Sequence, residues 1–445
     1  MKDISTPCRL LVGLVLCFSV AALSAQEGAK PFNQKEIIDS VTSLFRARYV
    51  YPEKAIKLDS AIRANFAAGK YAVDTTLETF AQSLRIDLQA ISSDRHIWVE
   101  PIPENRWYVL EGDTATTEQV AAMRADNFGW RELKYMQGGV GYINVVAFQD
   151  TTYAARTAEA ALSFMANCRT LIIDLRQHHG GEENMQKLVC SYFFKDPTQL
   201  SSLYWTYLDS TAPAWTQAKV SGTPLYDKQL YLLTSQATAS GAEAFAYNLK
   251  NSKRATLVGE TTRGAAHWTD DYEIHSLDVV VSVPVARPIH PLTGTSWEGT
   301  GVKPDIEVPA DQALDRAYLD ALEKLAANET DVAKKREIEW LVPTAQAKLS
   351  PVKLTPELIS KYVGEYRHPT KDKRYWIVEK DGRLYYRYTS GEEYGLIPLT
   401  ETIFGFDDGD PTRVRFVVAE TGRVVEMQFL TPDGEVLSRP RVSEK

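Results

Sequence analysis

Two stretches of sequence decide the fold: IIDLRQHHGG at residues 172–181 and LLTSQATASGAEAF at residues 232–245. Each begins within a continuous apolar run, at 170–175 and at 229–234, which is typical of a strand buried on both faces. A turn of small residues follows each run, and then a helical pattern. Further strands are predicted at 139–148, 255–260 and 279–285, and further helices at 155–165, 183–194 and 241–250. The repeated strand–turn–helix unit predicts an α/β fold class, with a sheet covered by helices.

Different patterns flank this α/β region. Before it, apolar residues recur at helical spacing, and after it come a charged helical stretch and then short alternating strands separated by glycine turns. We therefore divide the chain into a signal peptide (1–25), a small helical domain (30–100), the α/β core (101–312), a helical linker (313–350) and a small all-β domain (351–445).

The first 25 residues have the layout of a secretory signal peptide. Lys2 and Arg9 precede a short apolar run, and Ser24 and Ala25 provide a small-residue cleavage site. The run is too short for a comfortable transmembrane span. We expect export to the periplasm or the extracellular space, with no stable membrane insertion after cleavage; an uncleaved anchor is the alternative.

Composition narrows the range of partners. The 445-residue chain is 44% hydrophobic and 24% charged, with a net charge of −8 and no long basic run. We therefore expect no nucleic-acid partner. Cys168 and Cys190 are the cysteines beyond the signal peptide, and the sequence leaves open whether they pair or stay free. Neither has a metal-ligand neighbour, so no metal site is predicted. The oligomeric state is left open.

The two turns carry the residues suited to chemistry. Gly180 and Gly181 allow a sharp turn that exposes amide groups, and such amides can hold a developing negative oxygen. Ser240 stands at a helix start beside Gly241 and other small residues, which leave space for a substrate carbonyl. Two structural interpretations stay open: a tight turn without a ligand, and a serine that caps its helix.

A nucleophilic serine needs a proton acceptor, and histidine suits that task near neutral pH. The chain has seven histidines. They include His96, which follows the helical domain in the stretch Asp94-Arg95-His96, and His178 in the glycine turn. Pattern alone does not choose among them.

Four stretches together resemble the tail-specific, or C-terminal processing, peptidases of family S41. They are IIDLRQHHGG (172–181), LLTSQATASGAEAFAYNLKN (232–251), VGETTRGAAHW (258–268) and WEGTGVKPD (297–305). The chain is more similar to the branch of tricorn protease and interphotoreceptor retinoid-binding protein than to the branch with a catalytic lysine. This resemblance implies a ClpP/crotonase-like core, preceded by a small helical domain.

The resemblance assigns roles to particular residues. It implies that Ser240 is the nucleophile, that His96 is the general base, and that Glu298 polarises the histidine through an intervening polar group. Amides of Gly180, Gly181 and Gly241 would form the oxyanion hole.

Three positions depart from the family pattern. Ala265 stands where the other branch has its lysine, so a serine–lysine pair is not expected. Arg95 replaces the serine that precedes the histidine in tricorn protease, although Asp94 can orient His96 instead. His178 stands where the family often has asparagine, which makes it a rival base.

The resulting expectation is an exported serine peptidase that acts on peptide or protein substrates through an acyl-enzyme and needs no cofactor. The alternative is a non-catalytic binding protein of the same fold for apolar ligands or peptides. The co-occurrence of Ser240, His96 and Glu298 favours the peptidase, since a carrier needs none of the three. An esterase is a third option.

Overall fold

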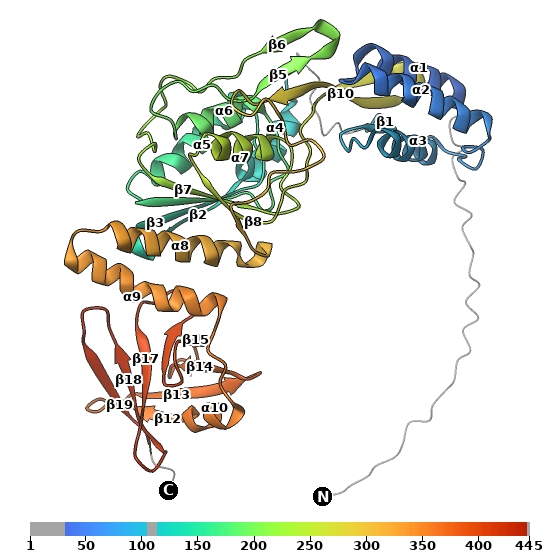
Figure 1. Ribbon diagram of the computed structural model, residues 1–445. Coiled ribbons are helices and arrows are strands. Elements are labelled where there is room, and N and C mark those ends of the chain that lie inside the picture. The colour runs from blue at the N-terminus through green and yellow to red at the C-terminus, as the bar shows by residue number, and fades with distance from the viewer. Residues whose placement is uncertain (1–31, 105–113, 443–445) are drawn as a thin grey trace, which may run out of the picture.

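The computed structural model describes residues 32–104 and 114–442 (Figure 1). In chain order these residues form an N-terminal helical region, a mixed α/β core, two long helices and an all-antiparallel β domain. This order confirms the predicted fold class. The predicted signal peptide lies outside the described residues. Within them, no helix combines the length and the apolar character that crossing a bilayer requires.

The N-terminal region consists of three helices: α1, Gln34–Arg48; α2, Pro52–Ala67; and α3, Leu77–Ser92. The side chains of Asn33 and Thr76 accept hydrogen bonds from amides in the first turns of α1 and α3, which satisfies donors that a helix start leaves free. The apolar faces of the helices, with Phe45 and Leu84 fully buried, share one core with strand β10.

A five-stranded antiparallel sheet completes that core. Its strands are β1, Trp98–Pro101; β5, Ser202–Trp205; β6, Ser210–Ala212; β9, Trp268–Ile274; and β10, Val279–Ile289. Strand β10 pairs with β1, β5 and β9. The strand predicted at 279–285 is therefore confirmed, but its assignment to the main sheet is wrong. Its apolar run indicates burial, and burial alone does not specify which sheet a strand joins.

The main sheet lies in the α/β core. Its strands are β2, Trp130–Met136; β3, Val140–Val145; β4, Thr170–Asp174; β7, Gln229–Thr234; β8, Thr256–Gly259; and β11, Ile306–Glu307. Their spatial order is β11-β8-β7-β4-β3-β2, and all neighbours are parallel except β2, which runs antiparallel to β3. The strands predicted at 139–148, 170–175, 229–234 and 255–260 are confirmed within a few residues.

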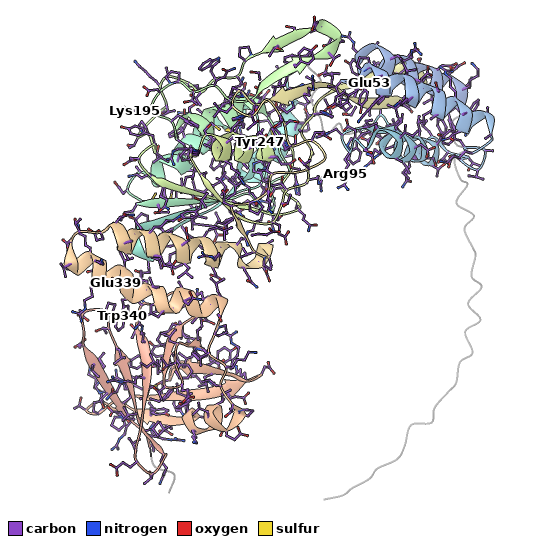
Figure 2. All side chains as sticks on the ribbon, viewed as in Figure 1. Glu53, Arg95, Lys195, Tyr247, Glu339 and Trp340 are labelled. Atoms are coloured by element: carbon purple, nitrogen blue, oxygen red, sulfur yellow. The ribbon has the colours of Figure 1, made fainter. Side chains whose placement is uncertain are left out.

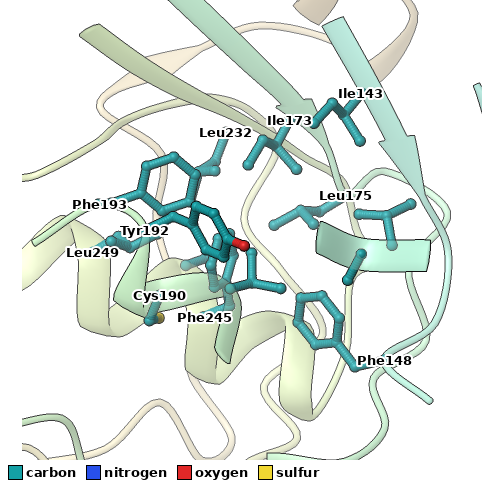
Figure 3. Packing of buried hydrophobic residues seen from close by; sticks show 14 of the residues in the cluster. Ile143, Phe148, Ile173, Leu175, Cys190, Tyr192, Phe193, Leu232, Phe245 and Leu249 are labelled. Atoms are coloured by element: carbon teal, nitrogen blue, oxygen red, sulfur yellow. The ribbon is translucent and has the colours of Figure 1, made fainter. Parts of the chain in front are cut away.

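Helices cover both faces of this sheet. Those of the core are α4, Thr117–Ala125; α5, Thr151–Phe164; α6, Glu183–Ser191; and α7, Gly241–Asn251. Successive strand residues point to opposite faces, so Ile173 packs with α5, α6 and α7 while Ile172 packs with helix α8, Ala313–Asn328. Figure 3 shows the first of these cores, in which Phe148 and Phe245 pack beneath the ends of the strands.

Helix α9, Val332–Leu349, joins the core to the C-terminal domain. The indole of Trp340, labelled on α9 in Figure 2, donates a hydrogen bond to the Pro411 carbonyl at 2.7 Å. The Arg413 guanidinium lies 3.7 Å from the centroid of the Trp340 ring. After α10, Pro356–Tyr362, eight strands pair in chain order. They are β12, Gly364–Arg367; β13, Arg374–Lys380; β14, Arg383–Arg387; β15, Glu393–Pro398; β16, Ile403–Phe406; β17, Arg413–Val418; β18, Val424–Leu430; and β19, Val436–Pro440.

The two cysteines of the α/β core are free thiols. Cys168 and Cys190 are both buried and do not form a disulfide. Burial raises the pKa of each thiol above its ordinary value. The sequence left open whether these two cysteines pair or stay free, and in the structure they stay free.

Candidate active site

The two turns singled out in the sequence lie side by side at one edge of the main sheet. Strands β4 and β7 are parallel neighbours, so the segments that follow them leave the sheet at the same edge. The Ala239 amide donates a hydrogen bond to the His178 carbonyl at 3.0 Å, which joins the two turns directly. The topology thus brings Ser240 to the glycine turn across about 60 residues of sequence.

Ser240 has a backbone that few residues other than glycine adopt. Its φ is 51° and its ψ is −121°, immediately before the first residue of α7. Such strain persists where surrounding contacts enforce it, which is common at functional sites. The side chain is half-buried and forms a capping box with Glu243: its oxygen faces the Glu243 amide, and the Glu243 carboxylate accepts from the Ser240 amide. Capping uses the hydroxyl oxygen as an acceptor, so it does not engage the hydroxyl proton.

A buried carboxylate holds this turn in place. Glu243, in the first turn of α7, accepts hydrogen bonds from the amides of Ser240 at 2.9 Å, Ala265 at 2.8 Å and Gly264 at 2.6 Å. The Thr262 hydroxyl donates to the same carboxylate. Burial raises the pKa of Glu243, although the hydrogen bonds from Thr262 and the amides act against that rise. Through Glu243 the serine turn is tied to the loop after β8.

The glycine turn is in backbone contact with the serine turn. A side chain at Gly180, where φ is 111°, would place its Cβ 2.7 Å from the Ser240 Cβ. A Cβ at Gly241 would meet the Gly181 carbonyl oxygen at 2.6 Å. The Gly180 amide is already engaged, since it donates to His178 Nδ1 at 3.0 Å. The amides of Gly181 and Gly241 have no acceptor among the described residues, so they are free to bind an oxygen beside Ser240.

His96 approaches from the helical region, on the segment between α3 and β1. Its amide donates to Asp94 Oδ1 at 3.0 Å, and its Nδ1 lies 3.4 Å from the same oxygen, too far for a well-formed hydrogen bond. The side chain is 14% exposed, and both ring nitrogens are buried. Burial acts to lower the pKa of His96, but the adjacent Asp94 carboxylate, with the charges of Glu298 and Glu243, raises it above its ordinary value.

Asp94 lies between two imidazoles. Its side chain is 2% exposed; Oδ2 lies 2.7 Å from His267 Nδ1 and accepts a hydrogen bond from the Tyr49 hydroxyl at 3.1 Å. Burial acts to raise the pKa of Asp94, but its hydrogen bond with His267 and the proximity of both imidazoles hold that pKa well below its usual range. The carboxylate is therefore ionised near neutral pH and stabilises positive charge on either ring.

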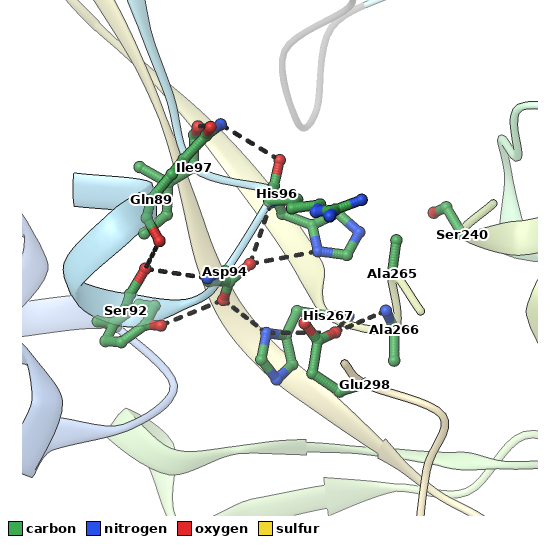
Figure 4. Close-up of polar contacts among 12 residues, drawn as sticks. Gln89, Ser92, Asp94, His96, Ile97, Ser240, Ala265, Ala266, His267 and Glu298 are labelled. Carbon is green, nitrogen blue, oxygen red and sulfur yellow. Dashed lines mark hydrogen bonds and ion pairs between the residues drawn. The ribbon is translucent and has the colours of Figure 1, made fainter. Parts of the chain in front are cut away.

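Glu298 completes a row of polar groups. It accepts hydrogen bonds from the amides of Ala266 at 2.7 Å and His267 at 3.2 Å, and its Oε2 lies 3.6 Å from His267 Nδ1. The row runs Glu298, His267, Asp94, His96 (Figure 4). The resemblance implied a polar group between Glu298 and the histidine, and the structure has His267 and Asp94 in that place.

The sequence reasoning missed the role of His267. A signal was available, because His267 lies near the end of the stretch VGETTRGAAHW, in the loop that follows strand β8. The structure places this loop at the same sheet edge as the serine turn. A polar residue that leaves a parallel sheet at its carboxyl edge is a candidate for the site.

Figure 4 shows the Ser240 hydroxyl on the side of the site that His96 faces, with Ala265 near the space between them. No hydrogen bond joins the two side chains, as is common at catalytic sites without a substrate. Arg95, the residue that departs from the tricorn pattern, is exposed and takes no part in the row of polar groups.

The rival base His178 is enclosed in the core. Its side chain is fully buried, with the ring 4.3 Å from that of Phe148, and its Nδ1 is occupied by the Gly180 amide. Burial, with a smaller effect of His179, lowers the pKa of His178 to about 3. The ring thus supports the glycine turn, and an asparagine oxygen can accept the same amide hydrogen bond.

Two family models match the chain. The model described as peptidase family S41 matches residues 139–308, and the N-terminal domain of peptidase S41 in eukaryotic IRBP matches residues 32–127. The first covers the main sheet from β3 to β11, with both turns and Glu298. The second covers α1 to α4, with Asp94 and His96.

Solved structures of low sequence identity are also similar to this chain. The photosystem II D1 C-terminal processing protease is 13% identical, over 63% of this chain and 94% of that chain, with a TM-score of 0.42. Mature CPAF is 13% identical, over 73% and 99%, with a TM-score of 0.44. Tricorn protease is 12% identical, over 66% and 37%, with a TM-score of 0.44.

The two family matches fall on the segments that build the candidate site, and they agree with the four sequence stretches that suggested the resemblance. The chain belongs to peptidase family S41.

Proposed function

We propose that this protein is a serine peptidase with Ser240 as its nucleophile and His96 as its general base. One observation carries the proposal: a serine hydroxyl on a strained turn lies beside two unused amides and faces a buried imidazole. Family S41 membership supports peptides or proteins as the substrates. A carrier of apolar ligands has no use for this arrangement.

The reaction follows from the roles that the groups can fill. Ser240 Oγ attacks the substrate carbonyl carbon while His96 Nε2 takes the hydroxyl proton. The carbonyl oxygen becomes negative and binds the free amides of Gly181 and Gly241. His96 then gives its proton to the leaving amine, and the C–N bond breaks to leave an acyl-enzyme. Water, activated by the same imidazole, hydrolyses the ester and frees Ser240.

Asp94 is suited to support each proton transfer. Its ionised carboxylate, close to His96 Nδ1, stabilises the imidazolium that forms when the serine is deprotonated. His267 and Glu298 hold Asp94 from its other side, so that the carboxylate keeps its orientation. The gap between the imidazole and Ser240 closes when a bound substrate draws the two together.

Ser240→Ala provides the direct test of the nucleophile. A fluorophosphonate probe should label the wild-type chain at Ser240, and labelling should be lost in the variant, because the probe reacts with an activated serine hydroxyl. Peptide mapping of the labelled chain identifies the site. Equal labelling of both proteins would rule out Ser240, and a folded wild-type chain that resists the probe would favour the binding-protein alternative.

His96→Ala should slow probe labelling by about 10²–10⁴-fold, the usual contribution of a positioned base. His178→Asn is the matched comparison, because asparagine retains an acceptor for the Gly180 amide. That variant should be labelled at close to the wild-type rate. A greater loss in His178→Asn than in His96→Ala would move the base to residue 178.

The pH dependence of labelling should report the raised pKa of His96. The base must be neutral, so the rate falls as the pH drops through that pKa, at a pH above the ordinary histidine value of about 6.5. Asp94→Asn removes the main contribution that raises the pKa of His96, so the labelling rate should fall at a lower pH than in the wild type. Asp278→Asn, at an exposed turn, should leave the pH dependence of labelling unchanged. A wild-type pH dependence in Asp94→Asn would contradict the pairing of Asp94 with His96.

Gly181→Ala tests the oxyanion amides. An added Cβ would lie 2.1 Å from the Phe148 carbonyl oxygen at a φ of 122°, so the turn must move and its amide with it. Labelling should fall by about 10²–10³-fold. Gly69→Ala is the control: φ is also positive there, at 76°, and no atom lies within 4 Å of the added Cβ. Similar labelling rates in two folded variants, checked by circular dichroism, would remove Gly181 from the mechanism.

We further propose that the protein is exported. Residues 1–25 combine a basic start, an apolar run and a small-residue cleavage site. Cell fractionation followed by N-terminal sequencing should find a chain that begins near Gln26, outside the cytoplasm. A cytoplasmic chain with the leader still attached would show that the segment does not direct export.

A further inference from the structure

Four side chains with metal-binding atoms converge beside the proposed nucleophile (Figure 4). Asp94, His96, His267 and Glu298 come from three separate segments, and each offers one donor atom within 4.8 Å of the others. Two imidazoles and two carboxylates form a donor set that suits Zn²⁺.

The spacing of these atoms is close to that of a tetrahedral site. Bonds of about 2.0–2.2 Å from zinc to nitrogen or oxygen place neighbouring donors roughly 3.4 Å apart. From His267 Nδ1 the distance is 2.7 Å to Asp94 Oδ2 and 3.6 Å to Glu298 Oε2, and His96 Nδ1 lies 3.4 Å from the other Asp94 oxygen, Oδ1. All four donors lie within 4.8 Å of one another, so the side chains must draw together to surround one ion.

The charge of the cluster also favours a divalent cation. When both carboxylates are ionised and both imidazoles are neutral, the cluster carries two negative charges. The ion-pair partners of Asp94 and Glu298 among the described residues are His96 and His267, and no lysine or arginine there forms an ion pair with either carboxylate. One divalent cation neutralises the two negative charges of the cluster, as two bound protons otherwise would.

His96 provides an independent observation that points to a ligand. Both of its ring nitrogens are buried and lack a well-formed hydrogen bond. Buried polar atoms in proteins almost always have a partner. A metal ion at Nδ1, on the Asp94 side of the ring, gives this imidazole the partner that the described residues do not provide.

We propose that Asp94, His96, His267 and Glu298 form a binding site for Zn²⁺ or a similar divalent transition-metal ion, and that the bound ion switches off the peptidase. The inhibition rests on the proposed function, whereas the binding does not. An ion at His96 Nδ1 keeps the ring proton on Nε2, the atom that must accept the serine proton. The reaction itself uses no metal, and metal and protons compete for the same imidazoles.

The experiment uses the full mature chain, treated with a chelator and then titrated with Zn²⁺ by calorimetry and with Co²⁺ by visible absorption. We expect one ion per chain and the absorption of four-coordinate Co²⁺. Labelling of Ser240 by the fluorophosphonate should fall in proportion to occupancy and recover fully with EDTA. A wild-type chain that takes up neither ion overturns the site, and full occupancy with unchanged labelling overturns the inhibition.

Variants separate the cluster from other histidines. His267→Asn and Glu298→Gln each remove one ligand and should weaken binding by at least about 10–100-fold. His275→Asn removes an exposed imidazole outside the cluster and should bind as the wild type does. Two ligand positions are tested because one variant can fail to fold, which circular dichroism detects. Wild-type affinity in both cluster variants overturns the assignment.

Ser240→Ala distinguishes failure of the metal site from failure of the peptidase mechanism. This variant should bind Zn²⁺ with wild-type affinity, because Ser240 is not one of the ligands. A wild-type chain that binds Zn²⁺ without reacting with the probe removes the peptidase proposal and keeps the site. A chain that reacts with the probe but binds no ion removes the metal site and keeps the peptidase proposal.

Discussion

Four hydrogen-bond donors from two loops converge on the buried carboxylate of Glu243, and the shape of the site depends on this interaction. The donors are the amides of Ser240, Gly264 and Ala265 and the hydroxyl of Thr262. Burying a carboxylate is costly unless its oxygens are hydrogen-bonded, so the loops that supply the donors are held together around it. The same contacts maintain the positive φ of Ser240, which an isolated turn would relax.

The groups proposed for catalysis come from two hydrophobic cores. Ser240 and the glycine turn belong to the parallel sheet, whereas Asp94 and His96 follow the helices that pack on β10. The contact between Asp94 and His267 joins residues 173 positions apart in the sequence. Strand β9 begins directly after His267, so the second imidazole lies where the chain passes from one core to the other. The site is thus a product of how the cores pack.

Much of this arrangement could be predicted from the sequence, and the limits have physical causes. The apolar runs of β4 and β7 predicted buried strands, and adjacent parallel strands bring Ser240 to the glycine turn. The place of His267 beside Asp94 could not be predicted, because it depends on β10 pairing with both β1 and β9. Apolar alternation does not reveal such pairing. Nor does sequence show that the Gly180 amide is taken by His178.

The division between two cores has a consequence for shortened forms of the protein. A fragment that begins after α4 retains every strand of the parallel sheet, together with Ser240 and both free amides. It lacks Asp94 and His96, and strand β10 loses the helices that cover its apolar face. Such a fragment keeps the scaffold of a hydrolase but has no imidazole placed to take the serine proton, and a newly bared hydrophobic surface promotes its association with other chains.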